Sequence, residues 1–277
     1  MSEGTPSSSL SDRVSRKRKR QTEESSQQNK THIAPIHGSG GPSKKKRKRN
    51  RNKPAAGDVR NDDRGGGIDE SIRKMDGRLL ADYFCQQAKR HNKELTAMEL
   101  NDLYVPEHAF LDTTTFELSR TLDQLPNFLK TYSPDNGSSL SEASERNGTP
   151  HTLVISSAAI RAADLVRKLR IFQTKRAIVG KLFAKHIKLE EAKQFLQRTR
   201  IGIGVGTPSR LIDLIESGAL KLEALERIVI DGSYIDQKKR GIFDIKEVHF
   251  PLLQLLTRPE LRERYGAEKN GVKILVF

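Results

Sequence analysis

The chain has 277 residues, of which 35% are hydrophobic and 31% are charged, so part of it lacks the apolar area that a packed fold needs. Residues 1–60 hold 16 Lys and Arg against 5 Asp and Glu, whereas the rest of the chain holds 34 against 30; this concentrated charge indicates a polyanionic partner or an import receptor. The single cysteine, Cys85, excludes an internal disulfide and a Cys-rich zinc site. With no apolar run near the roughly 20 residues of a membrane span and no secretory signal, we expect a soluble intracellular protein.

The first segment, residues 1–70, is polar and has almost no apolar periodicity, which predicts a disordered basic tail. Two clusters in it predict nuclear import; they consist of Arg16, Lys17, Arg18, Lys19 and Arg20, and of Lys44, Lys45, Lys46, Arg47, Lys48 and Arg49. A plain solvated tail is the alternative. Under either interpretation, cations near phosphates release counterions and add sequence-independent RNA affinity.

Residues 71–134 are predicted to form a helical extension. A helix over 78–91 would place apolar residues on one face: Leu79, Leu80, Tyr83, Phe84 and Ala88. Thr96 and Glu99 have the spacing of a capping box at the start of a second helix. A third helical pattern runs from Thr113 to Tyr132, with Pro126 expected to kink or divide it. The polar residues 135–150 then predict a linker or loop.

Residues 151–277 alternate short apolar runs with helical patterns. The predicted strands cover 153–156, 176–180, 201–205, 227–231 and 272–277, and the predicted helices cover 159–170, 189–197, 207–217 and 245–256. Such alternation is typical of an α/β domain whose parallel sheet is covered on both faces.

The segment IGVGTPSRLID, residues 203–213, contains the strongest local signal. Thr207 is a favourable N-cap residue, and Pro208 suits the first helical position because its missing N–H costs nothing there. The helix start would present free N–H groups to a phosphate, and Arg210 would add its fork of donors. A basic residue in a first turn is unfavourable for the helix dipole, which favours a role in binding.

The stretch VGTPSRLIDLIESGALKLEALERIVID resembles the part of DEAD-box RNA helicases that runs from the TPGR motif to the DEAD strand. Thr207, Pro208 and Arg210 match the TPGR motif, which in that family grips the RNA backbone, and Ser209 replaces its glycine. Upstream, LVISSAAIRAADLVRKL resembles the segment with the PTRELA motif, although the motif's Thr and Arg fall on Ala158 and Ala159. Arg161, two residues further on, is expected to substitute for that arginine in contacting RNA. The resemblance implies a RecA-like domain of three layers, related to P-loop NTPases, with its sheet left short or an edge covered by the extension helices.

The departures from that family concern the ATP site. The DEAD motif is replaced by Asp231, Gly232, Ser233 and Tyr234, so the magnesium-holding Asp is kept and the Glu that positions water is lost. No G-x-x-x-x-G-K-[ST] loop occurs, and the sequence ends at Phe277 before a Ser-Ala-Thr motif or a second RecA domain. Phosphoryl transfer requires a phosphate cradle, a metal site and a positioned water together. We therefore expect no enzyme activity, no cofactor and no metal.

A competing interpretation comes from Gly202, Gly204 and Gly206, whose spacing matches a methyltransferase nucleotide loop, with Asp231 as a ribose-binding acid. The glycines alternate with Ile and Val, however, which is more typical of a strand interior.

The basic tail, the AMELNDLYVPEHAF segment, the degenerate helicase-like domain and the run IDGSYIDQKKRGIFD together resemble the Cms-type family of small-subunit assembly proteins of the early (90S) pre-ribosome. The resemblance implies a non-catalytic, RNA-binding scaffold in the nucleus and nucleolus, whose partners are pre-ribosomal RNA, assembly proteins and an import receptor. A further phosphate contact is expected at Lys238, Lys239 and Arg240, with a solvated loop as the alternative. A protein-interaction platform, with RNA affinity from the tail alone, is the second hypothesis.

Overall fold

The computed structural model describes Met1 and residues 66–277. The chain divides into two units, Met1–Val59 and Arg60–Phe277, and every helix and strand described below lies in the second. Most of the predicted tail, with both import clusters, lies outside the described residues. Its expected end at residue 70 is wrong, because Gly67–Ile68 form the short strand β1 of the folded unit. Within residues 66–277, no helix has the length and apolar character needed to cross a membrane.

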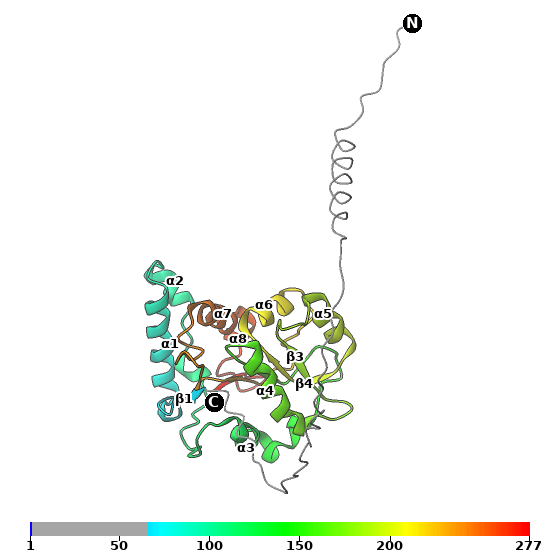
Figure 1. Cartoon of the computed structure of the whole chain (residues 1–277), viewed down its shortest axis with the longest axis horizontal. Coiled ribbons are helices and arrows are strands. Elements are labelled where there is room, and N and C mark those ends of the chain that lie inside the picture. The colour runs from blue at the N-terminus through cyan, green and yellow to red at the C-terminus, as the bar shows by residue number, and fades with distance from the viewer. Residues whose placement is uncertain (2–65) are drawn as a thin grey trace, which may run out of the picture. The chain divides into compact units, whose positions relative to one another are not determined.

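A parallel sheet of five strands forms the centre of the second unit (Figure 1). Its strand order is β3-β4-β2-β5-β7, and the strands span Ile178–Leu182, Ile201–Gly206, Thr152–Ile155, Arg227–Ile230 and Lys273–Val276, respectively. All neighbouring pairs run parallel. The predicted α/β class with a parallel sheet is confirmed, and the layout is compatible with that of RecA-like domains.

Helices cover both faces of this sheet, as the predicted alternation of elements requires. One face is packed by α5 (Leu189–Arg198), α6 (Pro208–Glu216), α7 (Lys246–Leu256) and α8 (Pro259–Arg262), and the other by α3 (Leu125–Thr131) and α4 (Ala159–Leu169). Alternate residues of a strand feed the two cores. In β2, Leu153 and Ile155 join the first core, whereas Val154 joins the second.

The N-terminal extension packs on the outer side of α7. It contains α1 (Gly77–His91) and α2 (Ala97–Asp102), and the capping box predicted at Thr96 and Glu99 begins α2. On α1, Leu80, Phe84 and Ala88 are buried as predicted. Leu79 is 52% exposed, so its predicted place on the buried face is wrong.

The third predicted helix is present only in its second half. Residues 113–121 are not helical, a 3-10 turn covers Leu122–Gln124, and Pro126 lies in the first turn of α3 rather than at a kink. Proline is tolerated in a first turn because the N–H that it lacks has no intrahelical partner there. The residues predicted as a linker, 135–150, overlap a 3-10 segment, Pro134–Ser141, which is interrupted at residues 135–137 and buries Leu140 in the second core.

The non-helical part of the extension covers the edge of the sheet at β7. Phe110 forms a parallel bridge with Ile274, and Leu111 donates its backbone N–H to the Ile274 carbonyl at 2.8 Å. Arg120, only 2% exposed, donates to the Val276 carbonyl and to both oxygens of Thr113. Either the extension helices were expected to cover an edge or the sheet was expected to be left short; the edge at β7 is covered, but by non-helical residues of the extension.

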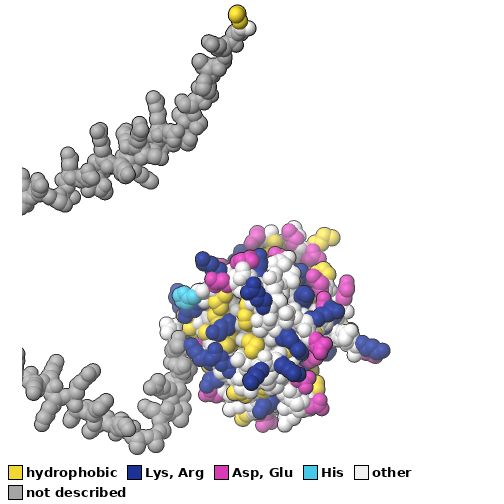
Figure 2. Space-filling model, turned by 90° about the vertical axis from the view of Figure 1, so that its right-hand side faces the viewer, with side chains coloured by type: hydrophobic (Ala, Val, Ile, Leu, Met, Phe, Trp, Pro, Cys, Tyr) yellow, Lys and Arg dark blue, Asp and Glu magenta, His cyan; other side chains and the backbone are white. Residues whose placement is uncertain are grey.

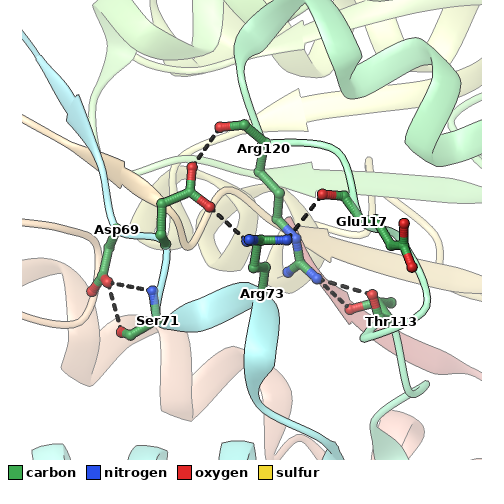
Figure 3. A network of polar contacts seen from close by, with 8 residues as sticks. Asp69, Ser71, Arg73, Thr113, Glu117 and Arg120 are labelled. Atoms are coloured by element: carbon green, nitrogen blue, oxygen red, sulfur yellow. Dashed lines mark hydrogen bonds and ion pairs between the residues drawn. The ribbon is translucent and has the colours of Figure 1, made fainter.

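Figure 3 shows how Arg120 belongs to a larger polar network, in which residues 69–73 meet residues 113–120. Arg73 forms an ion pair with Glu70 at 2.6 Å and donates to the Glu117 carbonyl at 2.9 Å. Ser119 donates to Glu70 at 2.5 Å. The network fixes the start of the folded unit against the segment that covers β7.

In strand β4, Gly202, Gly204 and Gly206 alternate with Ile203 and Val205, whose side chains join the second core, while Ile201 joins the first. A Cβ on Gly204 would lie 2.8 Å from Leu182 Cδ1 and 2.9 Å from Leu153 Cδ2, closer than packed atoms allow. The glycines therefore serve close packing inside a strand. They do not form a nucleotide loop, so the sequence pattern behind the methyltransferase interpretation is accounted for by packing.

Candidate functional site

The carboxyl ends of β2 and β5, two neighbouring strands, bring the degenerate DEAD segment next to the start of α4. Ser156 follows β2 and Asp231 follows β5, and the register pairs Ile155 with Ile230 directly before them. In open α/β sheets, ligands bind beyond this edge of the strands. The candidate site predicted from the sequence therefore lies where the fold would place one.

A bidentate ion pair occupies this position. Arg161 donates Nε–H to Asp231 Oδ2 and Nη2–H to Asp231 Oδ1, each at 2.9 Å, and Ser156 Oγ lies 3.5 Å from Oδ2. The Asp231 side chain is 1% exposed and that of Arg161 is 12% exposed. Burial alone would lower the pKa of Arg161, but the carboxylate of Asp231 outweighs it and raises that pKa above its usual value.

Tyr234 completes the arrangement from β6 (Tyr234–Ile235). The guanidinium carbon of Arg161 lies 4.2 Å from the centre of its ring, in cation–π geometry. Strand β6 pairs antiparallel with β1 (Gly67–Ile68), and Asp69 donates its N–H to the Ser233 carbonyl at 2.7 Å. The beginning of the folded unit is thus hydrogen-bonded along the degenerate DEAD segment.

These residues do not fit a magnesium–nucleotide site. Both oxygens of Asp231 accept hydrogen bonds from the same guanidinium, which supplies the positive charge that a metal would otherwise bring. A Cβ on Gly232 would lie 2.5 Å from Val276 Cγ1 and 3.0 Å from Phe243 Cε2, so the packing leaves no room for a glutamate at that position. No group of three or more His, Cys, Asp or Glu able to hold a metal occurs among residues 66–277.

Residues 207–210 lie at the end of β4, the strand on the other side of β2. Thr207 is the N-cap of α6 and Pro208 is its first residue, as predicted, but the Thr207 side chain makes no capping hydrogen bond. Arg210 donates Nη1–H to the Ile187 carbonyl at 3.1 Å, which holds its side chain toward the loop between β3 and α5. The first-turn N–H groups of α6 are therefore not capped by the Thr207 hydroxyl.

The remaining predicted contacts, Lys238, Lys239 and Arg240, form a separate exposed loop after β6. Asp236 organises it, because its carboxylate accepts from the N–H groups of Lys238 and Arg240 at 2.8 and 2.9 Å, and from Arg240 Nη2 at 3.1 Å. Arg240 is thereby paired within the loop, while no carboxylate among the described residues lies within salt-bridge distance of Lys238 or Lys239.

Comparison with known proteins places the chain in a family. The model of the family described as "U3-containing 90S pre-ribosomal complex subunit" (CMS1) matches residues 11–277. The chain belongs to this family. Protein CMS1 of Chaetomium thermophilum is 51% identical over 211 residues, which cover 76% of this chain and 84% of that protein. Human protein CMSS1 is 31% identical over 190 residues, which cover 69% of this chain and 62% of the human protein.

For this member of the CMS1 family, sequence reasoning named both Arg161 and Asp231 but did not join them. Arg161 was expected to contact RNA, whereas the structure directs two of its nitrogens at Asp231. The sequence shows that the two charges are opposite and that each residue follows a predicted strand, but it does not show that the fold makes these strands neighbours. Thr207, Pro208 and Arg210 lie at the same edge of the sheet, and the 238–240 loop is a separate feature.

Proposed function

We propose that this protein is a non-catalytic RNA-binding scaffold that works in early assembly of the small ribosomal subunit, in the nucleolus. Membership in a family described as a subunit of the U3-containing 90S pre-ribosomal complex supports the process and the compartment. The basic tail supports a polyanionic partner and, through the clusters Arg16–Arg20 and Lys44–Arg49, an import receptor.

The observation that carries the non-catalytic part is the buried ion pair at the degenerate DEAD position. We interpret the domain as a P-loop NTPase relative whose metal-binding Asp231 has become a structural partner of Arg161. Replacing magnesium by a guanidinium keeps the local charge balanced while removing the open coordination positions that phosphoryl transfer needs. The fixed pair stabilises the carboxyl end of the sheet.

In this proposal the domain's RNA contact lies at the start of α6. The first turn has no acidic residue and no side-chain cap, and the half-exposed Arg210 is held beside it by the Ile187 carbonyl. A helix N-terminus with free N–H groups suits a phosphate oxygen. Lys238 and Lys239 would add exposed charges, while Arg161 contributes less because Asp231 occupies it.

A crosslinking experiment in the full chain tests the RNA contact. In cells that express Arg210→Ala, crosslinks between pre-ribosomal RNA and residues 204–240 should fall relative to the parent. Arg262→Ala is the matched control, because Arg262 also donates to a single carbonyl, that of Tyr104 at 2.9 Å. Equal crosslinking in the parent and in Arg210→Ala would remove the domain contact from the proposal.

A second experiment tests the non-catalytic assignment. Calorimetry of the full chain with ATP–magnesium and with S-adenosylmethionine should show no binding heat, and no phosphate should be released from ATP. A measurable dissociation constant for either ligand would overturn the assignment.

A third experiment tests the role in assembly. The full chain is expected to sediment with the 90S particle, and a chain that does not would overturn that role.

A protein-interaction platform is the second candidate function. It is favoured by exposed apolar side chains on the extension, because Met98 is 80% and Leu79 is 52% exposed. A hollow of about 360 Å³ lies between α7 and the loop that joins α1 to α2. It is lined by Asn92, Glu94, Leu95, Lys246, Glu247, Phe250 and Pro251. Under this alternative, Met98→Glu would remove protein crosslinks and leave the RNA crosslinks unchanged.

A further inference from the structure

The charge of the folded unit is strongly polarised along the sequence. Residues 167–210 contain 12 Lys and Arg against two acidic residues, a net charge of +10, whereas the other residues from 66 onward contain 21 against 26, a net charge of −5. This stretch runs from the end of α4 through β3, α5 and β4 to the start of α6. One end of the sheet thus carries the folded unit's basic charge.

These cations reach the surface on the side of β3 and α5. Figure 2 looks at that side and shows Lys and Arg side chains spread across it, with Asp and Glu side chains mostly toward its rim. We call the exposed part of residues 167–200 the β3–α5 face. Strand β3 is the edge of the sheet, and its Lys181 is exposed.

Most of these cations have no counter-charge in the described part of the chain. Only Arg167, Lys168 and Lys193 form ion pairs, while Arg200 and Arg210 donate to carbonyls. Seven others are exposed, with no carboxylate of a described residue within 4.0 Å: Arg170, Lys175, Arg176, Lys181, Lys185, Lys188 and Arg198. Such a surface repels itself and is stabilised by a bound polyanion.

A hollow of about 400 Å³ lies on the β3–α5 face. It is lined by Thr174, Lys175, Arg176 and Arg200 on one side and by Ser141, Glu142 and Ala143 on the other. Arg200 is held in place by the carbonyls of Ser144 and Ala143, at 2.8 and 3.0 Å, and keeps its second terminal nitrogen without a hydrogen bond inside the described unit. A fixed guanidinium beside two exposed cations suits phosphate oxygens.

We infer that the β3–α5 face binds the sugar–phosphate backbone of RNA, on a surface that adjoins the start of α6 at Ile187 and extends beyond it. The inference rests on the proposed RNA-binding function. RNA is favoured over an acidic protein because the only large hydrophobic residue exposed within 167–210 is Ile171. Protein interfaces bury an apolar, aromatic-rich core, whereas nucleic-acid interfaces are polar and strongly positive. A backbone contact of this kind is independent of sequence and sensitive to salt.

The test uses the full chain with both tail clusters, Arg16–Arg20 and Lys44–Arg49, changed to Gln, so that tail affinity does not mask the domain. On this parent, the face variant carries Lys175→Gln, Arg176→Gln, Lys181→Gln and Lys185→Gln. The control variant removes four exposed charges elsewhere in the unit: Lys74→Gln, Lys89→Gln, Lys93→Gln and Lys269→Gln. Binding to a single-stranded RNA oligonucleotide is measured over a range of salt concentrations.

The face variant should bind about 10-fold or more weakly than the parent near physiological salt, and the slope of log K against log salt should fall by roughly 2 to 3. The control variant should keep the parent's slope. A charge-keeping variant, with the three Lys changed to Arg and Arg176→Lys, should bind like the parent. Equal losses in the face and control variants, or no loss in either, would overturn the inference.

Two further outcomes separate this inference from the proposals around it. If the face variant binds RNA like its parent but loses affinity for a polyglutamate peptide, the surface binds protein and the RNA assignment is wrong. If the full chain sediments with the 90S particle but the face variant binds RNA as tightly as its parent, only the present inference fails. If the full chain does not sediment with the particle, the proposed function itself fails.

Discussion

Replacing Arg161 by Met tests whether the buried ion pair is a structural substitute for a metal site. The substitution keeps an apolar stem over Tyr234 but leaves the Asp231 carboxylate, 1% exposed, with only Ser156 Oγ at 3.5 Å as a neighbouring donor. Two charge-assisted hydrogen bonds of 2.9 Å are lost. Removing one partner of a buried pair costs about 3–5 kcal/mol, a large part of the 5–15 kcal/mol typical of a whole protein.

Guanidinium denaturation of the full chain, followed by circular dichroism, measures this cost. The double variant Arg161→Met/Asp231→Leu should recover most of the lost stability, because a buried pair replaced by apolar groups of similar volume is close to neutral. Arg167→Met is the matched control on the same helix: its ion pair with Asp164 leaves the Arg167 side chain 53% exposed, so the change should stay within about 0.5 kcal/mol. A loss below about 1 kcal/mol for Arg161→Met, or no recovery in the double variant, would refute the reasoning.

Three further predictions concern other buried positions. Gly232→Glu, which restores the helicase residue, should cost about 1–3 kcal/mol because its Cβ would meet Val276 at 2.5 Å, and it should leave ATP hydrolysis absent; melting and phosphate release check both points. Arg120→Met should cost about 1–3 kcal/mol in denaturant midpoint experiments, and Arg120→Lys should restore only part. The loss removes the strongest donor from two buried carbonyls, since Thr113 then keeps only the Phe116 N–H at 3.2 Å and Val276 keeps Thr113 Oγ1 at 3.5 Å. Burial lowers the pKa of His151 and His249 from 6.5 to about 4, so between these pH values the unfolded chain binds protons that the native state does not. The free energy of unfolding should therefore fall by roughly 3 kcal/mol per histidine as pH drops from about 6.5 to 4. His249→Phe should make the plot of this free energy against pH less steep.

The sheet was predictable because its residues satisfy local rules. From Thr152 onward, each apolar run bounded by turns became a strand and each amphipathic run a helix, since burial on both faces leaves a clear pattern. The capping box at Thr96 was equally local, because two side chains three residues apart decide it.

The cover of β7 was not predictable in the same way. Phe116, Leu118 and Leu122 have helical spacing, yet Leu118 is 49% exposed and residues 113–121 are irregular, with a turn in place of a helix. The free edge of β7 decides this conformation, and its hydrogen bonds come from residues more than 150 positions away along the chain. A pattern read within one segment contains no information about such a distant partner. The β1–β6 pair was also missed. Its strands lie far apart in the sequence, and each has only two residues, which is too short for a visible pattern.

The candidate site combined both situations. The positions of Thr207 and Pro208 followed from helix-start chemistry, and the structure agrees with them. The role of Arg161 depended on the order of strands, which makes β2 and β5 neighbours although 70 residues separate Arg161 from Asp231. Only the topology reveals that pairing.

The glycines of β4 have a consequence for how the family can vary. The space that side chains at 204 and 206 would fill is taken instead by leucines from other elements, namely Leu153, Leu182 and Leu211. An alanine at 204 is tolerable only if one of these leucines becomes smaller at the same time. Residues 153, 182 and 204 should therefore change together among relatives: a larger side chain at one position is matched by a smaller one at another. The distance between the helix layer and the sheet then stays the same.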